Sequence, residues 1–243
     1  MEREISRLKM VLDNSRYTVA VCGSGVAEEG GFLSMKKPAR AYEIEEEYGD
    51  SPEEIFTSAY YNTRPLKFFR FYEKELLDKI PDPAPSSYAL AAMEKAGRLQ
   101  CVITTNMFEQ EQRAGCEHVI ELHGSVFKNR CPHCGTWYTV DDMRKEGAIP
   151  VCEKCGYTIR PLVSLYGEMV DSRIMTRTTE EIGKADVLLL LGTTLRSEVF
   201  SNYIRYFSGS MLVVIHQEPH YLDKWANMAL IGEPGAIFRQ LGY

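Results

Sequence analysis

Four cysteines form the clearest chemical pattern in the chain. They occur as two Cys-x-x-Cys pairs, Cys131 with Cys134 and Cys152 with Cys155, and seventeen residues separate the pairs. Thiolates at this spacing bind zinc in a tetrahedral ribbon. Four cysteine ligands leave no open coordination position, so we expect a structural zinc that contributes folding free energy. His133, between the first two cysteines, is expected to be exposed, and a role as an alternative ligand is the other interpretation.

Two polar residues follow apolar runs at places where chemistry is expected. The run Leu99–Thr104 leads to Asn106, and the run His118–Leu122 leads to His123. The carboxyl ends of parallel strands meet at one edge of an α/β sheet, where ligands bind. There the imidazole of His123 could act as a base near neutral pH. A hydrogen-bonded structural histidine and a turn asparagine are the alternatives.

Three other apolar runs end in turns of small or polar residues. Glycines in such a turn let the backbone approach a pyrophosphate, and the free N–H groups of the next helix favour an anion. Hydroxyl groups could hold a phosphate or ribose, and a carboxylate could accept from ribose hydroxyls. For the glycine turn after residue 22, an ordinary strand-to-helix turn is the alternative. The three turns are Gly23-Ser24-Gly25, Gly192-Thr193-Thr194 and His216-Gln217-Glu218.

Strands and helices alternate along the chain, which predicts an α/β fold with a doubly wound parallel sheet. Residues 186–191 form the most apolar segment, as expected of a central strand covered on both faces. Residues 32–48 have no clean period and are expected to form a mobile loop. The expected strands are 17–22, 99–104, 118–122, 186–191, 211–215 and 228–231. The expected helices are 1–13, 86–97, 172–183 and those beginning near Pro52, Pro65 and Pro234.

Composition limits the classes of function. A chain of 243 residues with 44% hydrophobic content can bury a full core, which indicates one large domain with a small insertion. The net charge of -6 argues against a nucleic-acid partner. The longest apolar run, Val187–Leu191, is too short to span a membrane, and the first residues do not resemble a signal peptide. Seven cysteines, four at metal spacing, favour a reducing cytoplasm.

Taken together and in order, these motifs resemble those of the sirtuins, the NAD-dependent protein deacylases. The resemblance covers nearly the whole chain and extends to the four-cysteine ribbon. The matching segments are Gly23-Ser24-Gly25, Thr104-Thr105-Asn106, His123-Gly124, Tyr166-Gly167-Glu168, Gly192-Thr193-Thr194 and Glu218-Pro219.

The resemblance implies a reaction. The acyl-lysine oxygen attacks C1′ of the nicotinamide ribose of NAD, nicotinamide leaves, and an alkylimidate forms. A ribose hydroxyl then attacks the imidate carbon, and water completes transfer of the acyl group to ADP-ribose with release of the lysine amine. His123 is then the general base that deprotonates a ribose hydroxyl, and Asn106 orients the ribose and a water. Proton transfer of this kind is typically worth about 10²–10⁴ in rate. The partner implied is an acylated protein lysine.

The resemblance also assigns residues and domains. A Rossmann-like NAD-binding domain is expected in 1–30, 86–126 and 160–243, and a small helical and zinc-ribbon domain in 31–85 and 127–159. The expected NAD-binding residues are Gly23, Ser24, Gly25, Thr104, Thr105, Asn106, Gly192, Thr193, Thr194 and Glu218. The expected substrate-binding residues are Val163, Ser164, Leu165, Tyr166 and Gly167.

The chain departs from the family pattern around the nicotinamide. The usual Gly-Ile-Pro-Asp-Phe-Arg is replaced by residues 31–36, Gly-Phe-Leu-Ser-Met-Lys. The Asp expected to bind the nicotinamide amide is replaced by Phe108. A buried carboxamide without its partner costs roughly 1–3 kcal/mol. We therefore expect a divergent member with an altered nicotinamide pocket.

Three other functions are consistent with parts of this pattern. A module that binds NAD or ADP-ribose without catalysis would bind the nucleotide without releasing nicotinamide. A protein ADP-ribosyltransferase would attach label from the adenylate half of NAD to a target. A zinc ribbon that serves only nucleic acid is disfavoured by the acidic balance and by the absence of an aromatic and basic patch.

Overall fold

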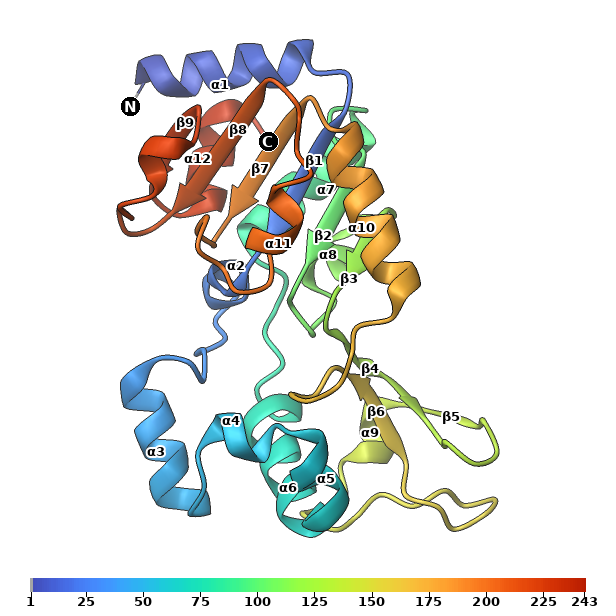
Figure 1. The fold of residues 1–243 in the computed structure, drawn as a ribbon. Coiled ribbons are helices and arrows are strands. Elements are labelled where there is room, and N and C mark those ends of the chain that lie inside the picture. Colours follow the sequence, from blue (N-terminus) through green and yellow to red (C-terminus); the bar gives the residue numbers. More distant parts are fainter. Residues whose placement is uncertain (1) are drawn as a thin grey trace. The chain divides into compact units, whose positions relative to one another are not determined.

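The computed structural model describes residues 2–243, which form two compact units (Figure 1). Unit 1 comprises the chain up to Gly31 together with Asp82–Leu122 and Asp171–Tyr243. Unit 2 comprises Phe32–Pro81 and His123–Val170. Each unit contains a sheet of its own.

Unit 1 is organised around a six-stranded parallel sheet with the order β3-β2-β1-β7-β8-β9. The chain adds β2 and β3 on one side of β1 and later returns to the other side at β7. This reversal of strand order is where doubly wound sheets bind ligands, outside the carboxyl ends of the strands. The predicted fold class is confirmed. The strands are β1 (Thr18–Cys22), β2 (Cys101–Thr104), β3 (Val119–Glu121), β7 (Val187–Leu191), β8 (Met211–His216) and β9 (Met228–Ile231).

Helices cover both faces of this sheet, so its central strands are buried on each side (Figure 1). Leu189 and Leu191 of β7 face a core shared with α1, α7 and α12, whereas Leu188 and Leu190 face α10 and α11. No helix in the described part of the chain combines the length and apolar character of a membrane span. The helices are α1 (Glu2–Asn14), α2 (Ser24–Glu29), α7 (Pro85–Lys95), α8 (Gln110–Ala114), α10 (Ser172–Lys184), α11 (Ser201–Ile204), the 3-10 helix η2 (Asp223–Trp225) and α12 (Pro234–Leu241).

At the amino edge of the sheet, Asp186, which directly precedes β7, binds the segment that leads into β1. Its carboxylate accepts from Ser15 Oγ at 2.6 Å and from the backbone N–H groups of Arg16 at 2.9 Å and Tyr17 at 3.0 Å. Burial acts to raise the pKa of Asp186, but these hydrogen bonds outweigh it and lower that pKa. The acid therefore joins β7 to the segment between α1 and β1.

Unit 2 combines a three-stranded antiparallel sheet with a group of short helices. The sheet order is β5-β4-β6, and Gly124 pairs with Val163. Its helical part buries Phe68, Phe69 and Tyr72, whose rings pack against one another. The strands are β4 (Gly124–Arg130), β5 (Trp137–Tyr138) and β6 (Arg160–Val163). The helices are α3 (Pro38–Tyr48), α4 (Pro52–Ile55), α5 (Ser58–Thr63), α6 (Pro65–Tyr72), the π-helix η1 (Glu73–Leu77) and α9 (Val140–Met143).

The prediction of a loop over residues 32–48 is wrong for residues 38–48, which form α3. Only Ile44 of this helix is buried, so the amphipathic period that identifies a helix in a sequence is absent. Its boundaries are set by Pro38 in the first turn and by Gly49, which ends the helix in the left-handed conformation. An ion pair between Arg40 and the buried Glu75 ties α3 to η1.

Candidate functional site

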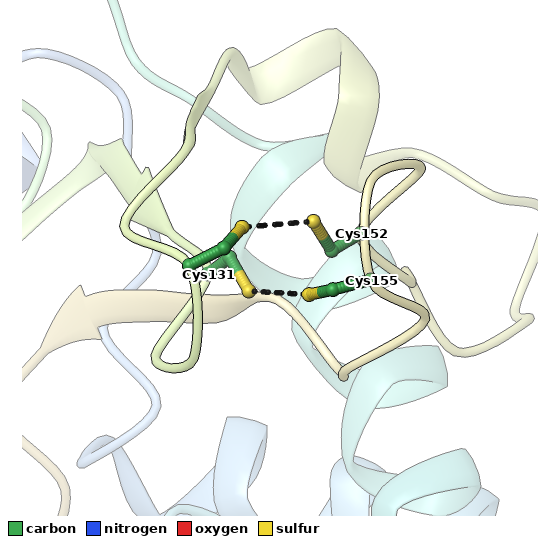
Figure 2. Close-up of side chains that lie close together, drawn as sticks. Cys131, Cys152 and Cys155 are labelled. Atoms are coloured by element: carbon green, nitrogen blue, oxygen red, sulfur yellow. Dashed lines mark hydrogen bonds between the residues drawn. The ribbon is translucent and has the colours of Figure 1, made fainter.

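The four predicted metal ligands converge in unit 2 (Figure 2). Their sulfur atoms lie within 4.8 Å of one another, with 3.4 Å between Cys131 and Cys155 and 3.5 Å between Cys134 and Cys152. Tetrahedral zinc with four thiolates requires sulfur atoms about 3.8 Å apart. The cluster therefore has the donor set and the spacing of a structural zinc site.

Two turns of the same construction present these cysteines. Gly135 N–H donates to Cys131 O at 3.0 Å, and Gly156 N–H donates to Cys152 O at 2.8 Å. Both glycines adopt positive φ, 76° and 73°, which these tight turns require. Each cysteine pair is therefore held by its own local backbone.

Aromatic side chains contact the cysteine cluster and its turns. Tyr138 Oη donates to Cys152 Sγ at 3.0 Å and accepts from Glu153 N–H at 3.1 Å. His133 stacks on Tyr157 with 4.3 Å between the ring centroids. His133 thus lies in a stack between the two turns. Hydrogen bonds to ligands orient a metal site and tune its affinity.

At the carboxyl edge of unit 1, the turns after β1 and β7 touch backbone to backbone. Gly25 N–H donates to Gly192 O at 2.9 Å, and Gly23 N–H donates to Leu191 O at 2.9 Å. A Cβ on Gly192, whose φ is +57°, would lie 2.6 Å from Val26 N and 2.7 Å from Gly25 Cα. Only glycines permit this close approach of the two backbones. Because the strand order reverses between β1 and β7, both turns lie at the switch point of the sheet.

The end of β2 carries a buried polar network. Asn106 N–H donates to Thr104 Oγ1 at 3.1 Å, and Asn106 Nδ2 donates to Glu111 Oε1 at 3.2 Å. Thr104 Oγ1 also contacts Glu111 Oε1 at 3.3 Å, while Thr105 N–H donates to Cys22 O at 3.1 Å. These bonds fix the Thr104-Thr105-Asn106 segment against β1 and α8.

Glu111 in this network is fully buried. Burial raises the pKa of its carboxyl, and hydrogen bonds from Asn106, Thr104 and Cys22 lower it only in part. No described residue bonds to its second oxygen, Oε2. Phe108, which precedes α8, is also buried.

The acid predicted after β8, Glu218, lies in a loop that folds back onto its own strand. Glu218 is exposed and follows closely on His216, the last residue of β8. His216 Nε2 pairs with Asp223 Oδ2 at 3.0 Å, and His220 N–H donates to the same oxygen at 2.8 Å. These contacts hold the loop that carries Glu218 at the carboxyl end of β8.

His123 is the first residue of the second part of unit 2. It is half-buried, and its backbone oxygen accepts from Ser164 N–H at 2.9 Å. The segment after β6 is also fixed, because Tyr166 N–H donates to Phe56 O at 3.0 Å and Glu168 bonds to both Arg160 and Leu165 N–H. His123 and the predicted substrate-binding stretch are therefore joined directly.

The predicted site residues fall into two groups. Unit 1 brings the glycine turns together and places Thr104, Thr105 and Asn106 at the end of the adjacent strand. Unit 2 brings His123 together with residues 163–167, of which Val163 and Leu165 are buried and Tyr166 is exposed. Sequence reasoning missed Glu111. Its only signal is an acid close to Asn106 in a stretch that otherwise looks like an ordinary polar turn.

A family model, sequence relatives and solved structures all match this chain to the same family. The family model described as the Sir2 family matches residues 23–199. A NAD-dependent protein deacetylase of Clostridium perfringens is 31% identical over 98% of this chain and 98% of its own. A solved structure described as Sir2 with a p53 peptide and NAD+ is 25% identical, with a TM-score of 0.84 over 98% of this chain and 96% of its own. A Sir2 homologue variant in complex with 2′-O-acetyl-ADP-ribose is 28% identical, with a TM-score of 0.84 over 97% of this chain and 94% of its own.

Proposed function

The chain belongs to the Sir2 family and is an NAD-dependent protein deacylase, and on this basis we propose how its residues share the reaction. The nucleotide is assigned to the carboxyl edge of the large sheet. The observation that carries this assignment is the contact between the glycine turns after β1 and β7, at the point where the strand order reverses. Unit 1 is then the NAD-binding domain, and unit 2 is the small domain.

The residues at this edge fit a dinucleotide. Backbone approach at Gly23, Gly25 and Gly192 suits a pyrophosphate, while hydroxyl and amide groups suit ribose. Glu218, exposed after β8, would accept from ribose hydroxyls. When bound, NAD supplies the ribose carbon that is attacked and the ADP-ribose that receives the acyl group. The further residues assigned to the nucleotide are Ser24, Thr104, Thr105, Asn106, Thr193 and Thr194.

His123 is assigned the role of general base. A neutral imidazole can take the proton of a ribose hydroxyl near neutral pH, directly or by relay. Asn106 is assigned to hold the ribose and a water. Both roles rest on the family membership and on the placement of each side chain after a strand of the large sheet.

The acylated lysine of a protein is assigned to the stretch 163–167. The buried side chains of Val163 and Leu165 anchor it, so Ser164 and Tyr166 are the side chains offered to a peptide. A p53 peptide bound to a solved relative supports a peptide substrate. The net charge of -6 favours a protein partner over nucleic acid, and the four thiols favour a reducing cytoplasm.

We also propose that the nicotinamide pocket is altered. Phe108 is apolar and buried where the resemblance places an aspartate, so a carboxamide would find no carboxylate from this position. An unpaired polar group costs roughly 1–3 kcal/mol, which would slow nicotinamide release without abolishing nucleotide binding.

Nicotinamide release with an acetyl-lysine peptide tests the assignment of the base. His123→Ala should lower turnover by about 10²–10⁴. His118→Ala is the matched control, because His118 is exposed and pairs with Glu94, and it should leave turnover unchanged. Equal turnover in the wild type and His123→Ala would contradict the assignment. Nucleotide binding without release by the wild type would favour a binding module, and labelled ADP-ribose on the peptide would favour a transferase.

A further inference from the structure

Glu111 is the buried acid that the proposed reaction does not use. It lies in α8, with its side chain among Asn106, Thr104 and Cys22 at the carboxyl ends of β1 and β2. An acid of this kind is costly in a core unless its charge is compensated. Its presence beside a proposed site residue therefore requires an explanation.

The hydrogen bonds around Glu111 converge on Asn106. Glu111 Oε1 accepts from Asn106 Nδ2 at 3.2 Å and from Thr104 Oγ1 at 3.3 Å. Thr104 Oγ1 in turn accepts from Asn106 N–H at 3.1 Å. The backbone and the side chain of Asn106 are thus both held by the same pair of residues.

This arrangement sets the orientation of the Asn106 amide. An amide can present either its oxygen or its nitrogen to a neighbour, and a carboxylate can only accept. With Glu111 as the acceptor, Nδ2 faces the core and Oδ1 is turned away from Glu111. An asparagine held in this way offers an oxygen acceptor, which suits a ribose hydroxyl or a water.

Glu111 is poorly satisfied as a purely structural residue. Its Oε2 has no hydrogen-bond partner within residues 2–243 and is buried. Replacing both partners of a buried polar contact, here Glu111 and Asn106, with apolar groups of the same shape can be nearly neutral or stabilising. Stability alone therefore does not account for a glutamate at this position.

We propose that Glu111 is a positioning residue, which fixes the Asn106 amide with Oδ1 available to the bound substrates. The inference rests on the proposed role of Asn106 in the deacylase reaction. It assigns Glu111 no contact with substrate. Its effect on the rate is carried entirely by Asn106.

A double-mutant cycle tests this dependence. Glu111→Leu removes the acceptor and should lower kcat for nicotinamide release about tenfold, with the KM for an acetyl-lysine peptide nearly unchanged. In an Asn106→Ala background the same change should have no further effect. Glu111→Gln keeps one acceptor oxygen and should restore most of the rate. An equal loss in both backgrounds, or no loss in either, would overturn the proposal.

Gln110 provides the matched control. It is the preceding residue of α8 and is equally buried, but its Nε2 donates to Asp82 O at 2.8 Å and takes no part in the bonds to Asn106. Gln110→Leu should leave kcat unchanged. A loss in Gln110→Leu as large as in Glu111→Leu would mean that general disturbance of α8 causes the effect.

A measurement independent of turnover separates this inference from the proposed function. In nitrogen-15 spectra, the side-chain amide of Asn106 is identified by its loss in Asn106→Ala. We expect this resonance to exchange slowly with solvent and to shift in Glu111→Leu but not in Gln110→Leu. A wild type that releases no nicotinamide would refute the proposed function alone. An Asn106 resonance that is unchanged in Glu111→Leu would refute the positioning role.

Discussion

The four-cysteine cluster of unit 2 and the Asn106 network of unit 1 are polar sites built in opposite ways. Two local turns of the same design present the cysteines, and each turn is closed by its own hydrogen bond. The Asn106 network joins the end of β1, the end of β2 and α8. The backbone hydrogen bonds that shape the cysteine turns are local, whereas the Asn106 network forms only when β1, β2 and α8 have come together.

The energetic roles of the two sites differ accordingly. Metal binding by the thiols contributes folding free energy to a small unit. The buried Glu111 leaves Oε2 without a described partner, which costs folding free energy. The first site therefore stabilises its surroundings, and the second depends on the stability of the surrounding sheet.

Loss of zinc should give the largest difference between the sites. Chelation or Cys152→Ser should unfold the cluster, because structural zinc sites in small peptides bind with about 10–16 kcal/mol. Unit 1 should stay folded, since its two apolar cores contain no residue of unit 2. Fluorescence of Trp137 in a Trp225→Phe background reports on the cluster, while circular dichroism reports on the remaining fold.

Cys116→Ser is the control for loss of a thiol outside the cluster. Cys116 belongs to unit 1, and burial raises the pKa of its thiol to about 12. This variant should keep its zinc and its Trp137 signal. A metal-free protein with an unchanged Trp137 signal would show that the cluster does not stabilise its surroundings.

The next largest effect is expected at the glycine contact of the large sheet. Gly192→Ala adds both the strain of φ +57° and a Cβ 2.6 Å from Val26 N. The free energy of unfolding should therefore fall by about 2–4 kcal/mol. Gly97→Ala in the same unit adds the strain alone, since no described atom beyond its two chain neighbours lies within 4 Å of its Cβ, and should lower the free energy of unfolding by about 1 kcal/mol. Urea unfolding measures both values, and equal losses would refute the backbone contact.

These differences also explain what the sequence could predict. The cysteine ligands and both glycine turns are visible because their spacing is local and their residue types are restrictive. Helix α3 was missed because only Ile44 is buried, so it lacks the apolar period that identifies a helix, and its contact with η1 is made by the charged Arg40. Glu111 was missed because its partners come from separate segments. Such contacts follow from the tertiary fold rather than from spacing.

Acid titration should distinguish Glu111 from Asp186, the well-bonded acid of the same unit. The pKa of Asp186 is lowered, so its contribution to stability is present above the unfolded pKa and is lost as pH falls through the folded pKa. The pKa of Glu111 is raised, so its contribution is present below the unfolded pKa and is lost as pH rises through the folded pKa. The two acids should therefore contribute slopes of opposite sign to the dependence of the free energy of unfolding on pH.

Urea unfolding of two isosteric variants across the acid range measures these slopes. Asp186→Asn should remove part of the rise in stability with pH, and Glu111→Gln should remove part of the fall. Because Asp186 is partly exposed, its contribution to the free energy of unfolding is limited to about 1 kcal/mol or less. Slopes that change in the same direction would mean that Glu111 is as well satisfied as Asp186.

The smallest effect is expected from the hydrogen bond beside the metal ligands. Tyr138→Phe removes the donor to Cys152 Sγ and should weaken zinc binding by about 0.5–1.5 kcal/mol, which is about 2- to 13-fold. Tyr157→Phe keeps the ring that stacks on His133 and should leave zinc affinity unchanged. Competition with a chromophoric chelator measures both affinities. An unchanged affinity in Tyr138→Phe would mean that the two turns alone set the strength of the site, because the loss of a supporting hydrogen bond would then have no consequence for the metal.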